Sequence, residues 1–269
     1  MNKMLLQHFL ILLSLSVLIG CHPIASDRKA LDYIYEEYGV TGSFILYNTK
    51  VDKYTYINYD RTQEGFLPCS TFKIPNSIIA LEEGIIPNEN HILRWDGETR
   101  ENEQWNKDHD LRSAFSQSVV WYYQALARDI GQDRMERYLK RFHYGNGGIS
   151  SGIDKFWLEG RFRVTQQQQI ALLKALFNQE LPVSTRTQSI VKSIMLYEKR
   201  PEGNVYAKTG MCYQGIKTIG WFIGSVETPE NTFIFANNIE KFNPDKRFIQ
   251  TRIESTFKIL EELKVLETD

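Results

Sequence analysis

The stretch PCSTFKIP, residues 68–75, combines a hydroxyl, an amine and a helix start within a few residues. Positions i and i+3 of a helix share one face, so the side chains of Ser70 and Lys73 can touch there. A serine in the first turn of a helix also keeps a backbone N–H without an intrahelical partner, close to the positive end of the helix dipole. The stretch therefore offers a nucleophile, a nearby base and one donor of an oxyanion hole. The competing interpretation is a plain helix start with an exposed lysine.

Two further short motifs follow at longer range. The segment SQSVV, residues 116–120, places Ser118 beside branched apolar residues on a helical segment. The tripeptide Lys208-Thr209-Gly210 closes a strand-like run. It could hold positive charge beside a nucleophile, donate a hydrogen bond and let a ligand approach the backbone at Gly210. Taken singly, the first motif reads as a serine packed in a helix and the second as a strand end turning into a loop.

The composition is that of an ordinary globular protein, and the first residues are typical of an exported one. A formal net charge of -1 over 269 residues gives no indication of a nucleic-acid partner. Lys3 and the apolar stretch over residues 4–19 have the build of a secretory signal, so we predict a signal peptide over residues 1–21. Residues 22–269 are then expected to form one domain.

The residues at the end of this signal leave two outcomes open. Residues 18–21, LIGC, resemble a bacterial lipobox, in which Cys21 becomes the lipidated first residue of the mature protein. The alternative is ordinary cleavage near residues 22–26, with Cys21 discarded. A transmembrane anchor is disfavoured because the apolar run is barely long enough to span a bilayer. Either outcome predicts an exported protein of the bacterial periplasm or cell envelope.

Two cysteines, Cys69 and Cys212, remain once Cys21 is set aside. Neither lies in a C-x-x-C metal pattern, and each adjoins one of the motifs described above. They can be read as small buried residues beneath the site or, in an oxidising compartment, as a disulfide. Both interpretations stay open.

Hydrophobic periodicity divides the chain into strand-like ends and a helical middle. We expect helices over residues 27–38, 70–83, 110–130, 133–142, 165–178, 184–197 and 248–266, and strands over residues 42–48, 53–58, 205–209, 218–226 and 232–238. The simplest assembly is one antiparallel sheet flanked by the terminal helices and built from about 27–62 and 201–269. The helical region, about 63–200, is then an insertion, and a cleft lies between the two parts. The fold class is α/β (α+β).

In their order along the chain, S-x-x-K, S-x-V and K-T-G resemble the motifs of the class D (oxacillinase-type) serine β-lactamases. Residues 68–78 match the active-site signature of that family. The other matching motifs are Ser118-Val119-Val120, Tyr144-Gly145-Asn146, Trp157-Leu158, Lys208-Thr209-Gly210 and Trp221-Phe222-Ile223-Gly224. The resemblance covers essentially the whole mature chain. It implies the serine β-lactamase and penicillin-binding-protein transpeptidase-like fold, with β-lactam small molecules as partners.

The resemblance also implies a mechanism. Ser70 would attack the lactam carbonyl to form an acyl-enzyme, and Lys73 would carry a carbamate formed from carbon dioxide or bicarbonate (N6-carboxylysine) that acts as general base. Only an uncharged amine adds carbon dioxide, so Lys73 must lose its proton near neutral pH, and apolar neighbours would allow this. The neighbours expected to form this wall are Phe72, Val120, Trp157 and Leu158. The Trp157 indole N–H could hold the carbamate.

The remaining roles follow from the same resemblance. Ser118 would relay a proton to the lactam nitrogen, and Lys208 would orient Ser118 and the substrate. The N–H groups of Ser70 and Met211 would form the oxyanion hole. The carboxylate of the substrate also needs a positively charged side chain to bind it.

Part of the carboxylate site would come from Lys208-Thr209-Gly210. Arg252, in the C-terminal helix, is the preferred further anchor, and Arg247 is its rival. The alternative for both arginines is a solvated helix-terminal charge.

Several other groups are not assigned to the chemistry. His109-Asp110 does not form a triad, because adjacent residues point in different directions on a helix and the lysine base makes a histidine unnecessary. The histidines show no metal spacing, so no metal and no other cofactor is expected. Tyr144 is expected in the floor of the cleft, and residues 98–110 are expected to form a solvated, mobile loop beside it.

Two rival functions share the acylation chemistry. A β-lactam sensor domain would acylate without turnover, and a peptidoglycan D,D-peptidase would lack the carbamate. The preferred β-lactam and the oligomeric state stay open at this stage.

Overall fold

The structure, a computed structural model, describes residues 24–267. The predicted signal peptide and Cys21 therefore lie outside the described residues. The strands are β1 (Ile24–Asp27), β2 (Thr41–Asn48), β3 (Lys53–Ile57), β4 (Leu196–Arg200), β5 (Gly203–Gln214), β6 (Lys217–Glu227) and β7 (Thr232–Phe242). The α-helices are α1 (Tyr33–Glu37), α2 (Tyr59–Thr62), α3 (Lys73–Glu82), α4 (Leu111–Ser116), α5 (Val120–Ile130), α6 (Gln132–Arg141), α7 (Gln166–Phe177), α8 (Thr185–Ile194) and α9 (Phe248–Glu262). Short 3-10 helices are η1 (Lys29–Leu31), η2 (Cys69–Phe72) and η3 (Glu103–Trp105).

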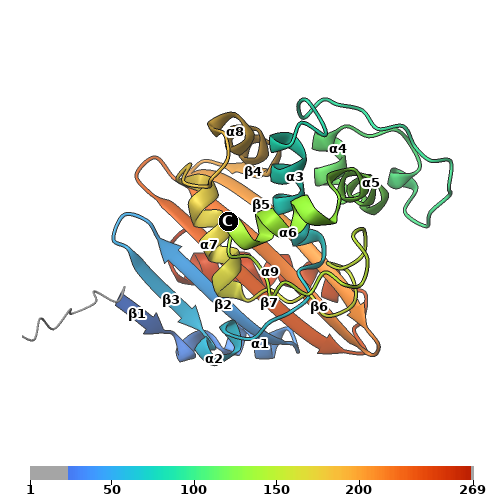
Figure 1. Ribbon diagram of the computed structural model, residues 1–269. Helices are drawn as coiled ribbons and strands as arrows, with labels where there is room; N and C mark the ends of the chain where they lie inside the picture. The colour runs from blue at the N-terminus through green and yellow to red at the C-terminus, as the bar shows by residue number, and fades with distance from the viewer. Residues whose placement is uncertain (1–23, 268–269) are drawn as a thin grey trace, which may run out of the picture.

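One sheet runs through the molecule in the order β1-β3-β2-β7-β6-β5-β4 (Figure 1). Neighbouring strands are antiparallel except β1 and β3, which are parallel. The inner strand β6 is buried along almost its whole length, as expected for a strand covered on both faces. The predicted antiparallel sheet built from both ends of the chain is therefore confirmed.

Helices cover both faces of the sheet (Figure 1). On one face, α1 and α9 bury an apolar cluster that includes Phe44, Phe222 and Phe235. On the other face, the helices between β3 and β4 bury a second, larger cluster. No helix among residues 24–267 is long and apolar enough to cross a membrane.

Three details of the expected secondary structure are wrong. The segment 27–38 is not one helix, because β1 occupies Ile24–Asp27 and only a 3-10 turn and the short α1 follow it. The segment 184–197 ends as strand β4, whose residues owe their conformation to pairing with β5 rather than to their own apolar pattern. The expected helix over 110–130 is two helices, α4 and α5, separated at Ser118.

Candidate active site

Ser70 and Lys73 lie side by side where the helical region begins. The 3-10 turn η2 holds Ser70, and α3 starts at Lys73. The Lys73 Nζ atom lies 3.0 Å from Ser70 Oγ, so the contact expected from their spacing is present. Pro75 falls in the first turn of α3, where its missing N–H breaks no helical hydrogen bond.

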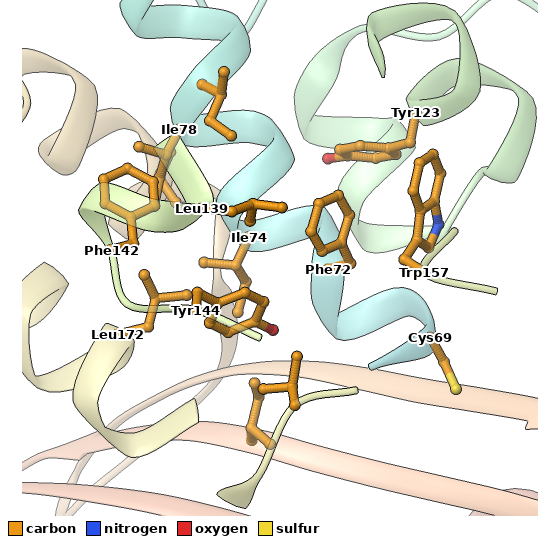
Figure 2. Close-up of a cluster of buried hydrophobic side chains, with 14 of the residues drawn as sticks. Cys69, Phe72, Ile74, Ile78, Tyr123, Leu139, Phe142, Tyr144, Trp157 and Leu172 are labelled. Carbon is orange, nitrogen blue, oxygen red and sulfur yellow. The ribbon is translucent and has the colours of Figure 1, made fainter. Parts of the chain in front are cut away.

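Apolar and aromatic groups enclose the Lys73 amine. The side chain is fully buried, and its Nζ atom lies 5.1 Å from the centroid of the Tyr123 ring. Phe72 stacks on Trp157 with ring centroids 5.1 Å apart, and Figure 2 shows this pair beside Tyr123 near the start of α3. Burial lowers the pKa of Lys73 from 10.5 to about 7. The amine can therefore release its proton near neutral pH, as the proposed chemistry requires.

The residues expected to form an apolar wall around Lys73 differ in how far they are buried. Trp157 is fully buried, while Val120 and Leu158 are half-buried. The Trp157 Nε1 atom is buried and has no hydrogen-bond partner among the residues that the structure describes. A buried donor without an acceptor is destabilising. The Trp157 indole N–H is therefore suited to donate to an acceptor that is not one of the described residues. The carbamate that the resemblance implies on Lys73 would be such an acceptor.

Ser118 occupies the break between α4 and α5 rather than a helix. Its φ of 56° lies in the left-handed region, which residues with a Cβ rarely adopt. Ahead of the break, the Phe115 ring centroid lies 5.6 Å from Lys208 Nζ, and beyond it Tyr123 contacts Lys73. Ser118 therefore lies in the chain between Phe115, which contacts Lys208, and Tyr123, which contacts Lys73.

Strand β5 brings Lys208 to the same place. Lys208 is buried, and its Nζ atom donates to the backbone oxygen of Thr209 at 3.1 Å and to the Thr209 hydroxyl at 3.3 Å. Burial, and next the charges of Lys73 and Arg252, hold its pKa well below the usual value. The surroundings of Lys208 therefore disfavour the positive charge that was expected of it from the sequence.

The pairing of β5 sets the direction of the Met211 N–H. The register between β5 and β6 runs without interruption from Asn204 to Gln214. Ala207 donates its N–H to Met195 at 2.8 Å, on the side away from β6. Alternate residues of a strand point their N–H groups to the same side, so the Met211 N–H points away from β6 as the Ala207 N–H does. Strand β4 does not extend this far, because its last pair with β5 is at Tyr206. The Met211 N–H is therefore available to an acceptor at the open edge.

Gly210 allows a close packing contact between β5 and the nucleophile segment. A Cβ atom at this position would lie 3.0 Å from the Pro68 carbonyl oxygen and 3.1 Å from Thr71 Cγ2. The missing side chain thus lets β5 pack directly on the nucleophile segment. Gly210 remains next to the site because its backbone lies between Thr209 and Met211.

Of the two candidate arginines, Arg252 reaches the site. Its Nη1 atom donates to the Gly210 carbonyl at 2.9 Å, and its Nε atom is buried without a partner among the described residues. Burial lowers the pKa of Arg252 to about 10. Arg247 is exposed at the start of α9. The preference for Arg252 therefore agrees with the geometry.

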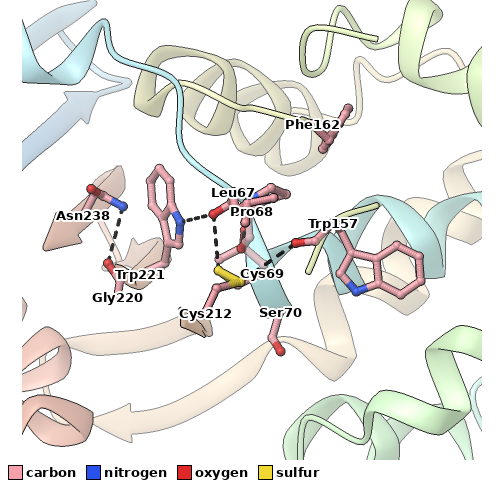
Figure 3. Close-up of a disulfide and its surroundings, with 12 residues drawn as sticks. Leu67, Pro68, Cys69, Ser70, Trp157, Phe162, Cys212, Gly220, Trp221 and Asn238 are labelled. Carbon is pink, nitrogen blue, oxygen red and sulfur yellow. Dashed lines mark hydrogen bonds between the residues drawn. A yellow bond between two sulfur atoms is a disulfide. The ribbon is translucent and has the colours of Figure 1, made fainter. Parts of the chain in front are cut away.

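A disulfide joins Cys69 to Cys212, which decides the alternative that the sequence left open (Figure 3). The Cys69 N–H donates to the Trp157 carbonyl at 3.0 Å. The Trp221 indole donates to the Leu67 carbonyl at 2.9 Å. The chain entering the nucleophile turn is thus held by β5, by β6 and by the loop that carries Trp157.

Residues 98–110, which form the rim of the site and were expected to be a solvated loop, are mostly exposed and contain one 3-10 turn, η3. Trp105, in η3, donates its indole N–H to the Gln117 carbonyl at 3.0 Å and accepts one from Trp121 at 2.8 Å. His109 is buried, with ring nitrogens 3.1 Å from Ser113 Oγ and 2.9 Å from the Gln104 carbonyl oxygen. The rim is thus tied to the α4–α5 break, and His109 has a structural place within it.

Two contributors to the site were missed from the sequence, Tyr123 and Gln169. Gln169 Nε2 donates to the Thr71 hydroxyl at 2.9 Å, and its oxygen accepts from Tyr144 at 3.0 Å, beneath the nucleophile turn. A signal was present for Gln169, since it is a polar residue on the buried stripe with Leu172, Leu173 and Leu176. Tyr123 has no comparable local signal. Tyr144 is buried and packs against Phe72, with ring centroids 6.4 Å apart. Residues 24–267 contain no cluster of three or more His, Cys, Asp or Glu side chains that could hold a metal.

Comparisons with known proteins point to one family. The family model for the penicillin binding protein transpeptidase domain matches residues 41–261. The chain is 38% identical over 252 residues to β-lactamase OXA-48 of Klebsiella pneumoniae, covering 93% of this chain and 94% of that protein. The crystal structure of the class D β-lactamase YbXI from Nostoc is similar with a TM-score of 0.84 and 42% identity, covering 88% of this chain and 99% of that one.

A regulatory protein is also similar. The chain is 37% identical over 207 residues to the regulatory protein BlaR1 of Bacillus licheniformis, which is 77% of this chain but 34% of that protein. The matches to OXA-48 and to the Nostoc enzyme each cover 88% or more of both chains. The chain belongs to the class D β-lactamases, a family of serine hydrolases with the penicillin-binding-protein transpeptidase fold.

Proposed function

We propose that this protein hydrolyses the amide bond of β-lactam antibiotics through an acyl-enzyme on Ser70. The observation that carries the proposal is the fully buried Lys73 amine, 3.0 Å from Ser70 Oγ, with its pKa lowered to about 7. A lysine of that pKa is uncharged in a large fraction of molecules at neutral pH, unlike an exposed lysine. It is therefore competent both to accept a proton and to add carbon dioxide.

The residues around Ser70 divide the work of acylation. The Ser70 oxygen attacks the lactam carbonyl, while the N–H groups of Ser70 and Met211 stabilise the developing oxyanion. Ser118 passes a proton to the lactam nitrogen as the ring opens, and Lys208 orients Ser118 and the substrate. Water then hydrolyses the ester and frees Ser70.

Substrate binding falls to the neighbouring groups. Thr209 and Arg252 bind the carboxylate, since a guanidinium can bind it through two hydrogen bonds. Val120, Trp157 and Leu158 form the apolar wall on the other side, and the Gly210 backbone lines the edge of the site.

Lys73 is proposed to be modified to N6-carboxylysine. The residues present fit the group: the amine is desolvated, and the buried Trp157 Nε1 lacks an acceptor within residues 24–267. A carbamate on Lys73 would supply the general base for acylation and for hydrolysis of the acyl-enzyme. Carbon dioxide or bicarbonate is the only cofactor this chemistry needs.

The similarity to BlaR1 supports one alternative, a sensor domain that is acylated and then hydrolyses poorly. Turnover of a chromogenic cephalosporin by the purified mature protein separates the two. We expect many turnovers per molecule, faster with added bicarbonate. A single stoichiometric burst would instead favour a sensor or a D,D-peptidase.

The Trp157→Phe variant sharpens this experiment, because it keeps the ring that stacks on Phe72 and removes the indole N–H. We expect kcat to fall about tenfold at ambient bicarbonate, since a hydrogen bond to a charged group contributes about 1.5–3 kcal/mol. Added bicarbonate should restore much of the loss. A kcat equal to that of the wild type without added bicarbonate would contradict the role of the indole.

Export to the bacterial periplasm or cell envelope is part of the same proposal, with residues 1–21 as the signal. Mass spectrometry of the exported protein distinguishes a diacylglyceryl group on Cys21 from cleavage near residues 22–26.

A further inference from the structure

The Cys69–Cys212 disulfide joins the immediate neighbours of both proposed oxyanion donors. Cys69 precedes Ser70, and Cys212 follows Met211. The two Cα atoms lie 5.6 Å apart although 143 positions separate them in sequence. Figure 3 shows the bridge close to Ser70, with Trp221 on one side and Trp157 on the other. A change in this bridge would therefore act first on the relative position of the two donors.

The backbone at Cys69 needs external support. Its φ of 54° is left-handed, a conformation that residues with a Cβ rarely adopt. This residue turns the chain from Pro68 into η2, so its conformation sets the direction of the Ser70 N–H. Its N–H is held by the Trp157 carbonyl, and its side chain is held by the bridge.

The other end of the bridge lies on a strand with one free edge. The last residue of β5 that pairs with β4 is Tyr206, Ala207 still donates its N–H to Met195, and from Lys208 to Gln214 the strand is paired with β6 alone. The free edge rests on the nucleophile turn, where Gly210 approaches the Pro68 carbonyl and the Thr71 side chain. Apart from the disulfide, this contact is made by van der Waals packing, which permits sliding more readily than a covalent bond does.

We propose that the Cys69–Cys212 disulfide is a positioning element of the oxyanion hole, which fixes the separation of the Ser70 and Met211 N–H groups. The inference rests on the proposed function of these two groups. Opening the bridge lowers the rate constant of acylation and leaves the initial binding of the β-lactam nearly unchanged, because the oxyanion forms only in the transition state.

Reduction of the bridge is a balanced exchange with an added dithiol such as dithiothreitol. One thiolate of the reagent attacks a sulfur of the bridge and forms a mixed disulfide, and the second thiolate closes the reagent into a ring. The S–S bond of the protein is replaced by two S–H groups, and the dithiol is oxidised to its cyclic disulfide. Cys69 and Cys212 are both buried, so reduction is carried out during refolding and verified by mass spectrometry after alkylation.

The test measures acylation by a fluorescent penicillin in single-turnover experiments on the oxidised protein, the reduced protein and the Cys69→Ala/Cys212→Ala variant. Each rate constant is normalised to the burst amplitude, which counts the folded, reactive sites. We expect the rate constant to fall about tenfold without the bridge, less than the 10²–10³ typical of deleting a donor outright. The dissociation constant of the non-covalent complex should change less than twofold.

A second variant separates the cross-link from the backbone conformation. Cys69→Gly/Cys212→Ala lacks the bridge but contains a residue that adopts positive φ without strain. If the cross-link positions the donors, this variant stays about as slow as the double-alanine variant. Recovery of the wild-type rate constant by glycine would overturn the proposal, as would equal rate constants with and without the bridge.

Acylation also keeps this test distinct from the test of hydrolysis. Oxidised protein that is acylated quickly but does not turn over would refute the proposed hydrolase, while the ratio of acylation rates would still decide the role of the bridge. Oxidised protein that no penicillin acylates would refute both proposals.

Discussion

Two buried cations, Lys73 in the cleft and Arg61 at the β2–β7 part of the sheet, are almost equally hidden from water but have opposite surroundings. Arg61 donates to Ser43 Oγ at 2.9 Å, to Asn238 Oδ1 at 2.7 Å and to Glu240 Oε2 at 3.1 Å. The charge of Arg61 is therefore compensated by hydrogen bonds to Ser43 and Asn238 and by an ion pair with Glu240.

The surroundings of Lys73 do not compensate a charge in this way. The described contacts of its amine are the Ser70 hydroxyl and the Tyr123 ring, and no carboxylate appears among the causes of its pKa shift. Removing a cation from water is unfavourable unless acceptors replace the lost solvent, so the lysine loses its proton more readily. The difference teaches that acceptors, rather than depth of burial, decide whether a buried cation is structural or reactive.

Replacing Lys73 with methionine should break the comparison most strongly. We expect Lys73→Met to lower the rate of β-lactam hydrolysis by about 10³-fold or more, because both acylation and deacylation lose their base. The free energy of unfolding should rise, since an uncompensated buried amine is replaced by an apolar chain. Chromogenic turnover and urea unfolding measure the two effects, and normal turnover in this variant would exclude Lys73 as the base.

The dependence of kcat on pH tests whether Lys73 is uncharged near neutral pH, and the expected effect is somewhat smaller than that of the Lys73→Met variant. Lys73 binds a proton as the pH falls through about 7, whereas in the unfolded chain it does so near 10.5. At fixed bicarbonate, kcat should therefore fall about tenfold for each pH unit below 7. Lys208 on β5 and Arg252 on α9 face the same region, and the charges of Lys73 and Arg252 lower the pKa of Lys208 after burial. A profile that stays flat down to pH 5 would contradict the assignment.

The same shift predicts the pH dependence of stability. Between about pH 7 and 10.5 the unfolded state binds more protons at Lys73 than the folded state, so this group makes stability rise with pH in that window. In buffer purged of carbon dioxide, the rise should be smaller in Lys73→Met than in the wild type.

Replacing Arg61 gives the smallest expected effect on activity. Arg61→Met leaves Ser43 and Asn238 without their donor, while Glu240 keeps its ion pair with Lys217 at 2.6 Å. We expect the free energy of unfolding to fall by about 2 kcal/mol, and kcat per folded molecule to stay within twofold of the wild type. A large fall in kcat with an unchanged free energy of unfolding would contradict the assignment of Arg61 to a structural role.

The sequence predicted the parts of the fold that depend on local pattern. The long strands β5, β6 and β7 and the helices α6, α7 and α9 follow their apolar periodicity, and Thr165 with Gln168 forms the expected capping box at the start of α7. The edge strands β1 and β4 were missed because such strands are short and polar and depend on a neighbour. The left-handed break at Ser118 was missed because the residues on both sides are helical.

The site shows the same division between local and distant information. The contact of Ser70 with Lys73 follows from helix geometry. Of the wall beside them, only Phe72 is close in sequence, and Trp157, which stacks on it, was named after the resemblance. The distant members, Lys208 and Arg252, came from the resemblance alone, since no local rule brings β5 and α9 together. The disulfide could not be decided either, because its cysteines meet only after the whole helical region has folded between them.

That bridge has a consequence for where the protein matures. It closes a loop of 143 residues, and in chain-entropy terms such a closure destabilises the unfolded state by about 5 kcal/mol. Chains held in a reducing cytosol forgo this contribution and gain it only on reaching an oxidising compartment. If the protein is exported as proposed, newly made molecules are therefore less stable against unfolding before export than after it.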